Sequence, residues 1–161
     1  MNTSPASDKK LLYPIVGASV ALFTLQDLQL KVLLVRRARA PRGWALPGGV
    51  LNPESDASLD HTALRELARK TDVKLPHLEQ VHTFSGPQRD PRGWSASTLY
   101  YALLPGDQVP AVAASRTEAI EWCDPERPGH RLVFDHARML PVALATLRDK
   151  VERGALPLHL L

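Results

Sequence analysis

Two adjacent glycines followed by a charged helical segment are the residues of this chain best suited to chemistry. The stretch Leu46-Pro-Gly-Gly49 precedes a loop, and a later stretch carries Arg65-Glu66-Leu67. Glycines adopt backbone conformations that other residues avoid, and they let a ligand approach the backbone closely. A helix entered from such a loop points unpaired N–H groups at whatever lies there, which is usually an anion. The arrangement therefore predicts a binding site for a ligand that carries phosphate.

The elements that must position these residues are short and of both kinds. Apolar and β-branched residues predict strands over 15–23 and 30–35 that could pair as a hairpin. Apolar residues at helical spacing predict a helix that Asp56 or Ser58 could cap and that ends near 71–72. Further strands are expected over 78–84, 97–104 and 119–122, and a second amphipathic helix over 134–152. This order predicts a mixed α+β or α/β sandwich.

Length and composition fit one globular domain. The chain has 161 residues, of which 44% are hydrophobic and 23% charged, and its formal net charge is +3. It has no dense run of Lys and Arg, so nucleic acid is not implied as an obligate partner. The single cysteine, Cys123, excludes a disulfide framework and a zinc site built from cysteines. The polar start resembles no signal peptide and no apolar stretch could cross a membrane, so a cytoplasmic protein is expected.

On these residues the chain resembles the Nudix hydrolase family. The family box reads G-x5-E-x7-R-E-U-x-E-E-x-G-U, with U aliphatic, and commonly follows a W-x-L-P-G-G strand end, which residues 44–49 match. The segments 89–94 and 132–140 are similar to the branch that contains ADP-ribose pyrophosphatases and Nudix-related transcriptional regulators of NAD metabolism. The resemblance covers about residues 14–155. It implies an α/β/α sandwich around a mixed sheet, with tails over 1–13 and 156–161.

The resemblance also implies a reaction, the Mg²⁺- or Mn²⁺-assisted attack of water on a nucleoside diphosphate linked to another group. In that reaction Glu66 would be the surviving acid of the box, and Arg65 would orient it. Ser55 stands in the position of the first box glutamate, and Glu54 comes one position early. Glu54 and a late glutamate, Glu118 or Glu121, could complete a metal site with Glu66.

Arg69 and Lys70 stand where the box has two adjacent glutamates, and Asp72 stands where it has glycine. One charge pair about 4 Å apart is worth roughly 4 kcal/mol at an effective dielectric of about 20. Exchanging two anions for two cations therefore disfavours a divalent metal held in the usual way. Two interpretations of Arg69 and Lys70 remain open. They are solvated cations at a helix end, or they contact a pyrophosphate directly in the role that metal ions have in active relatives.

Other residues are candidates for the substrate side of the site. Arg92 could hold a phosphate, as could Arg36 and Arg37 where the second strand ends. Trp94 could stack on a base or pack against the sheet. The predicted binding set consists of Gly48, Gly49, Arg69, Lys70, Arg92 and Trp94.

Two functions follow from these residues. The chain is a divergent hydrolase of ADP-ribose or related nucleoside diphosphate derivatives, or it is a domain that binds or senses such a nucleotide without cleaving it. The regulators of this branch continue into a winged helix-turn-helix, for which a chain ending at Leu161 leaves no room, so DNA is not an expected partner. Analogy with the family makes a homodimer plausible.

Overall fold

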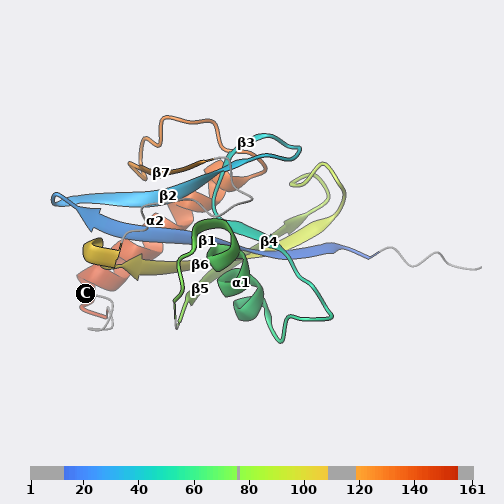
Figure 1. Cartoon of the computed structure of the whole chain (residues 1–161), viewed down its shortest axis with the longest axis horizontal. Coiled ribbons are helices and arrows are strands. Elements are labelled where there is room, and N and C mark those ends of the chain that lie inside the picture. Colours follow the sequence, from blue (N-terminus) through green and yellow to red (C-terminus); the bar gives the residue numbers. More distant parts are fainter. Residues whose placement is uncertain (1–12, 76, 109–118, 156–161) are drawn as a thin grey trace, which may run out of the picture.

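The computed structural model describes residues 13–75, 77–108 and 119–155, so nearly all of both predicted tails lies outside it. Along the described residues, a group of strands precedes each of the two α-helices (Figure 1). Their bounds are β1 (Ile15–Gln26), β2 (Gln29–Arg37), β3 (Gly43–Ala45), β4 (Gly48–Val50), α1 (Leu59–Thr71), β5 (Glu79–Gly86), β6 (Ser95–Leu104), a 3₁₀ turn η1 (Gly106–Gln108), β7 (Ala119–Cys123) and α2 (His136–Glu152).

The predicted hairpin is confirmed. Strands β1 and β2 pair antiparallel, with Phe23 opposite Val32 and Gln26 opposite Gln29. Asp27 and Leu28 make the turn in the left-handed region, with φ of 49° and 63°. Residues 32–35 of β2 are buried without alternation, as expected for a strand covered on both faces.

Beyond the first few pairs the two strands of this hairpin separate. Strand β4 takes the free edge of β1, pairing with residues 17–19, and β3 takes the free edge of β2, pairing with residues 35–37. The segment 43–50 therefore crosses the gap between the two strands. On their other edges β1 pairs in parallel with β6, and β2 pairs antiparallel with β7. The result is a mixed sheet with an opening where β1 and β2 diverge.

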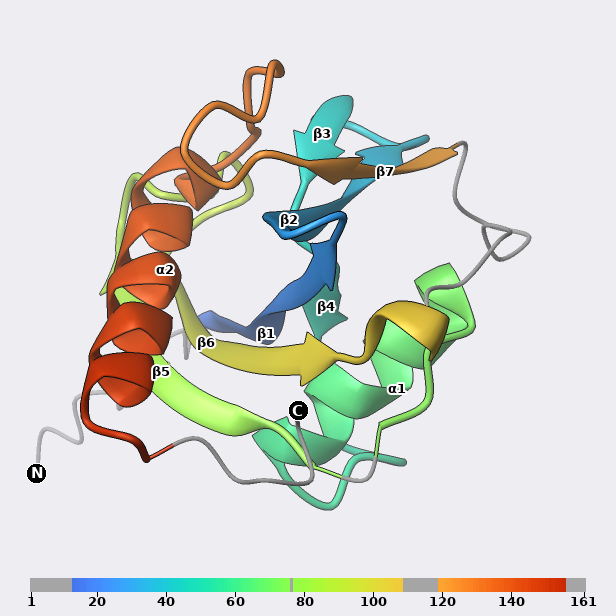
Figure 2. The ribbon, with the colours of Figure 1, turned by 90° about the vertical axis from the view of Figure 1, so that its left-hand side faces the viewer.

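The two helices cover opposite faces of this sheet (Figure 2). Helix α2 contributes Met139 and Leu140 to one buried cluster, together with alternate residues of β1 and β2 such as Phe23. Helix α1 contributes Ala63 and Leu67 to a second cluster with the intervening strand residues. The predicted α/β/α sandwich around a mixed sheet is confirmed. In the described part of the chain, neither helix is long and apolar enough to traverse a lipid bilayer.

Local signals set the ends of α1. Ser58 is the N-cap, and its side chain accepts a hydrogen bond from the backbone N–H of His61 at 3.1 Å. Of the two predicted caps, Ser58 is therefore confirmed and Asp56 is wrong. The helix ends as predicted, at Thr71, because Asp72 turns into the left-handed region with φ of 59°.

Candidate functional site

A cavity of about 790 Å³ opens where β1 and β2 separate. This volume lies within the range of roughly 300–1,000 Å³ that is typical of small-molecule sites. Its lining includes seven cationic side chains and two carboxylates, which gives it a strongly positive potential. The cations are Arg36, Arg37, Arg39, Arg69, Lys70, Arg89 and Arg92, and the carboxylates are Glu66 and Asp90.

Gly48 and Gly49 line this cavity, as predicted, but for a different reason than backbone freedom. Neither has φ in the left-handed region. A Cβ at Gly49 would lie 2.5 Å from Cδ of Glu66, and a Cβ at Gly48 would collide with the backbone of Ala18. The two glycines are therefore required because α1 and β1 approach β4 too closely for any side chain.

Helix α1 faces the cavity with its second half. Its lining residues are Glu66, Arg69 and Lys70. The N-terminus of α1, which is capped by Ser58, is not among the lining residues. The expectation that the first N–H groups of this helix face an anion is therefore wrong. The positive groups that α1 presents to the cavity are instead the side chains of Arg69 and Lys70, near its C-terminal end.

Glu66 is buried and both of its carboxylate oxygens are already bound. Oε1 accepts from Nη1 of Arg65 at 2.5 Å, and Oε2 accepts from Nη2 of Arg69 at 2.6 Å. The ammonium of Lys70 lies 3.7 Å from Oε2. Residues 66, 69 and 70 meet because positions three and four apart share one face of a helix. Three cations of the same helix thus neutralise this one carboxylate.

Lys70 is held inward rather than solvated. Its side chain is 17% exposed, and Nζ donates to the carbonyl oxygen of Gly48. Burial lowers the pKa of Lys70 to about 8, although the nearby Glu66 opposes that shift. Arg69 is 37% exposed and forks onto Glu66. The interpretation of the pair as solvated cations at a helix end is therefore wrong for Lys70, and both residues line the cavity.

Arg65 connects Glu66 to a second carboxylate, that of Asp56. Nε and Nη2 of Arg65 donate to the two oxygens of Asp56 at 2.7 and 2.6 Å. Asp56 also accepts from the hydroxyl of Thr62 at 2.8 Å and from the backbone N–H of Asn52 at 2.9 Å. The hydrogen bonds from Arg65 hold the pKa of Asp56 well below its usual range, and they raise the pKa of Arg65. Arg65 is thereby fixed in the orientation in which it contacts Glu66.

The oxygens around Glu66 do not fit a divalent metal. Mg²⁺ and Mn²⁺ need several hard oxygen ligands, usually carboxylates and carbonyls. The carboxylate of Glu66 and the carbonyl of Gly48 both lie near the ammonium of Lys70, and each is already bound by a cationic side chain. Glu54 is exposed in the turn before α1 and is not a lining residue of the cavity. The structure therefore does not bring Glu54 to Glu66.

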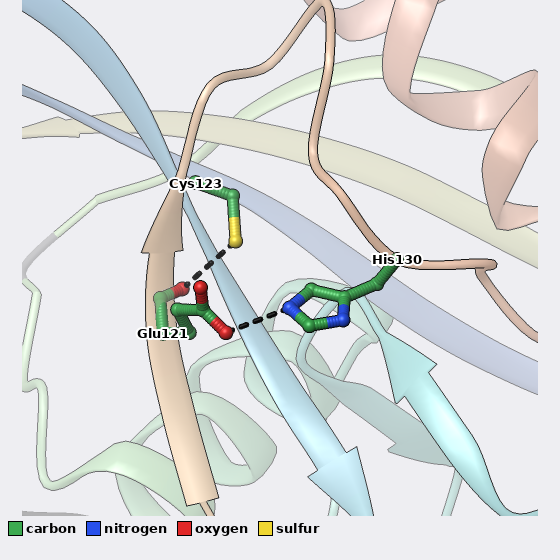
Figure 3. Close-up of side chains that lie close together, drawn as sticks. All are labelled: Glu121, Cys123 and His130. Carbon is green, nitrogen blue, oxygen red and sulfur yellow. Dashed lines mark hydrogen bonds and ion pairs between the residues drawn. The ribbon is translucent and has the colours of Figure 1, made fainter.

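The predicted substrate loop lies only partly at the cavity. Arg92 lines it and pairs with Asp90, with Nη2 2.8 Å from Oδ2. Trp94 is 49% exposed and is not a lining residue, so its packing in the core is excluded and its stacking on a base stays a prediction. Among the late glutamates, Glu118 lies outside the described residues. Glu121 lies near Cys123 and His130 instead of at the cavity (Figure 3).

Three lining residues had no functional role from sequence. Arg89 pairs with Asp135 at 2.7 Å, which ties the loop before β6 to the start of α2. His136 is buried, and its Nδ1 accepts the backbone N–H of Leu46 at 3.0 Å. Burial lowers the pKa of His136 to about 4, so the ring is neutral and supports the segment that carries the glycines. Arg39 follows β2 in the segment 36–43, whose four arginines were the available signal.

Comparison with known proteins agrees with this architecture. A family model described as the NUDIX domain matches residues 16–143. The ADPR responsive transcriptional repressor NtrR of Acinetobacter baylyi is 37% identical over 151 residues, which cover 92% of this chain and 60% of that protein. An ADP-ribose pyrophosphatase of Methanocaldococcus jannaschii is 27% identical over 125 residues, or 76% of this chain and 70% of that enzyme.

A solved structure gives the same picture. The NUDIX domain of Shewanella oneidensis NrtR complexed with ADP ribose superposes with a TM-score of 0.78 at 35% identity, covering 89% of this chain and 94% of that one. The chain spans about 60% of the length of the Acinetobacter repressor. The family resemblance found in the sequence is confirmed, including its ADP-ribose branch.

Proposed function

Because the chain belongs to the NUDIX domain family, we propose that it binds ADP-ribose or a similar nucleoside diphosphate derivative through its own cationic side chains, without metal and without hydrolysis. One observation carries this proposal. Both oxygens of Glu66 are engaged by Arg65 and Arg69, and Lys70 lies between Glu66 and Gly48. The acid that a metal-dependent reaction would need is therefore already neutralised.

The charge of the cavity supports a diphosphate as the ligand. Guanidinium groups bind phosphate oxygens in a bidentate way, and lysine adds a compact positive charge. Arg69 and Lys70 both line the cavity, next to the double glycine, and the Lys70 side chain is the more buried of the two. In this proposal their charges stabilise the diphosphate that metal ions stabilise in active relatives.

The rim of the cavity supports the rest of such a ligand. Arg92 is half exposed, so its guanidinium can turn from Asp90 toward a phosphate. Arg37 lies 4.8 Å from the ring centre of Phe134, and both line the cavity. These groups offer one charged and one flat apolar surface at the same opening, which suits a nucleotide better than an inorganic anion. Trp94 is proposed as an outer wall for the base.

Metal-dependent hydrolysis is the second candidate. The similarity to the Methanocaldococcus ADP-ribose pyrophosphatase favours it. It would assign Glu66 to a Mg²⁺ or Mn²⁺ ion and Arg65 to orienting that acid. It also requires Arg69 and Lys70 to leave Glu66 before a metal can bind there. The present geometry supports the binding function over this alternative.

Calorimetry with ADP-ribose, first in EDTA and then with Mg²⁺ or Mn²⁺, separates the two functions. We expect binding in EDTA and no release of AMP with either metal. Lys70→Met should weaken binding by about 10-fold or more, because a charge-assisted hydrogen bond is worth roughly 1.5–3 kcal/mol. Arg153→Gln is the matched control, since Arg153 is an exposed cation at the end of α2. Metal-dependent AMP release that Glu66→Gln abolishes would overturn the proposal.

The remaining expectations about partners and location stay predictions. NtrR of Acinetobacter baylyi is described as a transcriptional repressor, and a structure of Shewanella oneidensis NrtR contains DNA. A homodimer and a cytoplasmic location rest on the family resemblance and on the sequence. Size-exclusion chromatography with light scattering, with and without ADP-ribose, would test the dimer.

A further inference from the structure

Outside the cavity, three side chains with metal-binding atoms come together on β7 and the loop that follows it (Figure 3). Glu121 and Cys123 are two positions apart on β7, so their side chains share one face of the sheet. His130 reaches the same place from the loop between β7 and α2. One donor atom from each residue lies within 4.8 Å of the others, and Nε2 of His130 is 2.7 Å from Oε2 of Glu121.

These separations suit a common metal ion. Zinc binds sulfur at about 2.3 Å and nitrogen or oxygen at about 2.0–2.2 Å, so tetrahedral donors lie roughly 3.3–3.6 Å apart. That spacing falls between the 2.7 Å contact and the 4.8 Å upper limit found here. Small rotations of the glutamate and the imidazole are therefore enough to admit an ion.

Two of the three donors are held in place by their neighbours. Cys123 is buried, on a strand position paired with Val32 of β2. The His130 ring stacks on Trp44 of β3, with centroids 4.3 Å apart and an interplanar angle of 22°. The Glu121 side chain is 49% exposed, so it can adjust and leaves a path from solvent. Preorganised donors of this kind reduce the ordering that an ion must impose.

We propose that Glu121, Cys123 and His130 form a Zn²⁺ site, with water as the fourth ligand. A thiolate and an imidazole select zinc over Mg²⁺ and Mn²⁺, which prefer oxygen ligands. When zinc binds, the Cys123 thiol releases its proton to solvent and the ring proton of His130 moves from Nε2 to Nδ1 through solvent. The hydrogen bond between His130 and Glu121 is then replaced by one bond from each residue to the ion. The site joins β7 to the loop before α2, so zinc stabilises this edge of the sheet.

This site is independent of the proposed nucleotide function, because none of its three residues lines the cavity. Its loss would leave ADP-ribose binding in EDTA intact. Failure of one proposal therefore does not imply failure of the other.

The test is titration of the metal-free full chain with Zn²⁺ against a chromophoric chelator, together with Co²⁺ absorption spectroscopy. We expect one equivalent of zinc that excess Mg²⁺ does not displace, and a thiolate-to-cobalt charge-transfer band. Cys123→Ser should remove the band, and His130→Ala should weaken zinc binding by about 10-fold or more. The control is His82→Ala, because His82 is an exposed histidine on β5.

Circular dichroism of each variant keeps the test interpretable. His130 is in a loop and partly exposed, so His130→Ala should fold even if substitution of the buried cysteine disturbs β7. Absence of the charge-transfer band in the wild-type protein would overturn the proposal. So would zinc binding that His130→Ala and His82→Ala affect equally.

Discussion

The carboxylates of Glu66 and Glu121 have different neighbours. Glu66 in the cavity is bound by Arg65 and Arg69 and approached by Lys70. Glu121 on β7 instead lies beside His130 and Cys123, which can themselves bind a metal. The difference shows that a carboxylate in a pocket does not by itself make a metal site. What neutralises it in the folded chain decides which ligand it can accept.

The difference follows from the period of each element. A helix places residues three and four positions apart on one face, so Arg69 and Lys70 necessarily flank Glu66. A strand places residues two positions apart on one face, so Cys123 joins Glu121. If the proposed function is correct, changing two residue types on α1 converts a site for cations into one for anions without any change of fold.

The largest expected effect is that of Glu66→Gln on stability. It would leave three neighbouring cations without their shared carboxylate, which is buried. Removing one partner of a buried ion pair costs about 3–5 kcal/mol, and we expect the lower end because Arg69 is more than a third exposed. Urea denaturation measures the change. A decrease in the free energy of unfolding of less than about 1 kcal/mol would mean that the three cations rotate into solvent in the variant.

Reversing two charges of the cavity should allow it to bind a metal ion, as is proposed for the group on β7. The double variant Arg69→Glu and Lys70→Glu is expected to lower ADP-ribose affinity in EDTA by about 100-fold and to create measurable Mn²⁺ binding. Lys74→Glu with Arg153→Glu is the matched control, because both residues are exposed and the change in net charge is the same. Calorimetry with ADP-ribose and with Mn²⁺ checks both effects. Equal losses in the two double variants would indicate that only overall charge matters.

The effect of pH tests Lys70 alone. Its pKa of about 8, lowered by burial, predicts that ADP-ribose affinity falls roughly 10-fold between pH 7 and 9 as the ammonium loses its proton. Stability changes in the opposite direction. The unfolded lysine, with a pKa of about 10.4, binds more protons above pH 8, so the free energy of unfolding rises with pH in that window. Lys70→Met should show neither dependence, and affinity that still falls 10-fold in this variant would exclude Lys70 as the group responsible.

Much of the fold was predictable because its signals are local. The strand composition, the hairpin of the first two strands and the Ser58 cap each depend on residues close together in sequence, and all three are confirmed. The double glycine also pointed to the right place. The reason for it was not predictable, since the contact of Gly49 with Glu66 appears only when α1 packs on β4.

The site was less predictable because its residues meet through long-range packing. Asp56 was interpreted as a helix cap, but its carboxylate binds Arg65, which lies nine residues further along the chain within α1. His136 reaches Leu46 across 90 residues of sequence. The group of Glu121, Cys123 and His130 was missed because His130 comes from a loop after the strand. Only the pair at positions 121 and 123, which share one face of β7, was visible in the sequence. Spacing within an element is visible in sequence, whereas contacts between elements are not.

The smallest expected effect is that of Glu121→Gln in the metal-free protein. This carboxylate pairs with His130 at 2.7 Å, but its side chain is 49% exposed. Exposed pairs contribute about 0–1 kcal/mol, so the melting temperature should hardly change, in contrast to Glu66→Gln. With zinc present the same substitution removes a charged ligand, so it should abolish most of the zinc-induced rise in melting temperature. ADP-ribose affinity should stay that of the wild-type protein. A zinc-induced rise equal to that of the wild type would show that Glu121 is not a ligand, and the contrast with Glu66 would then rest on exposure alone.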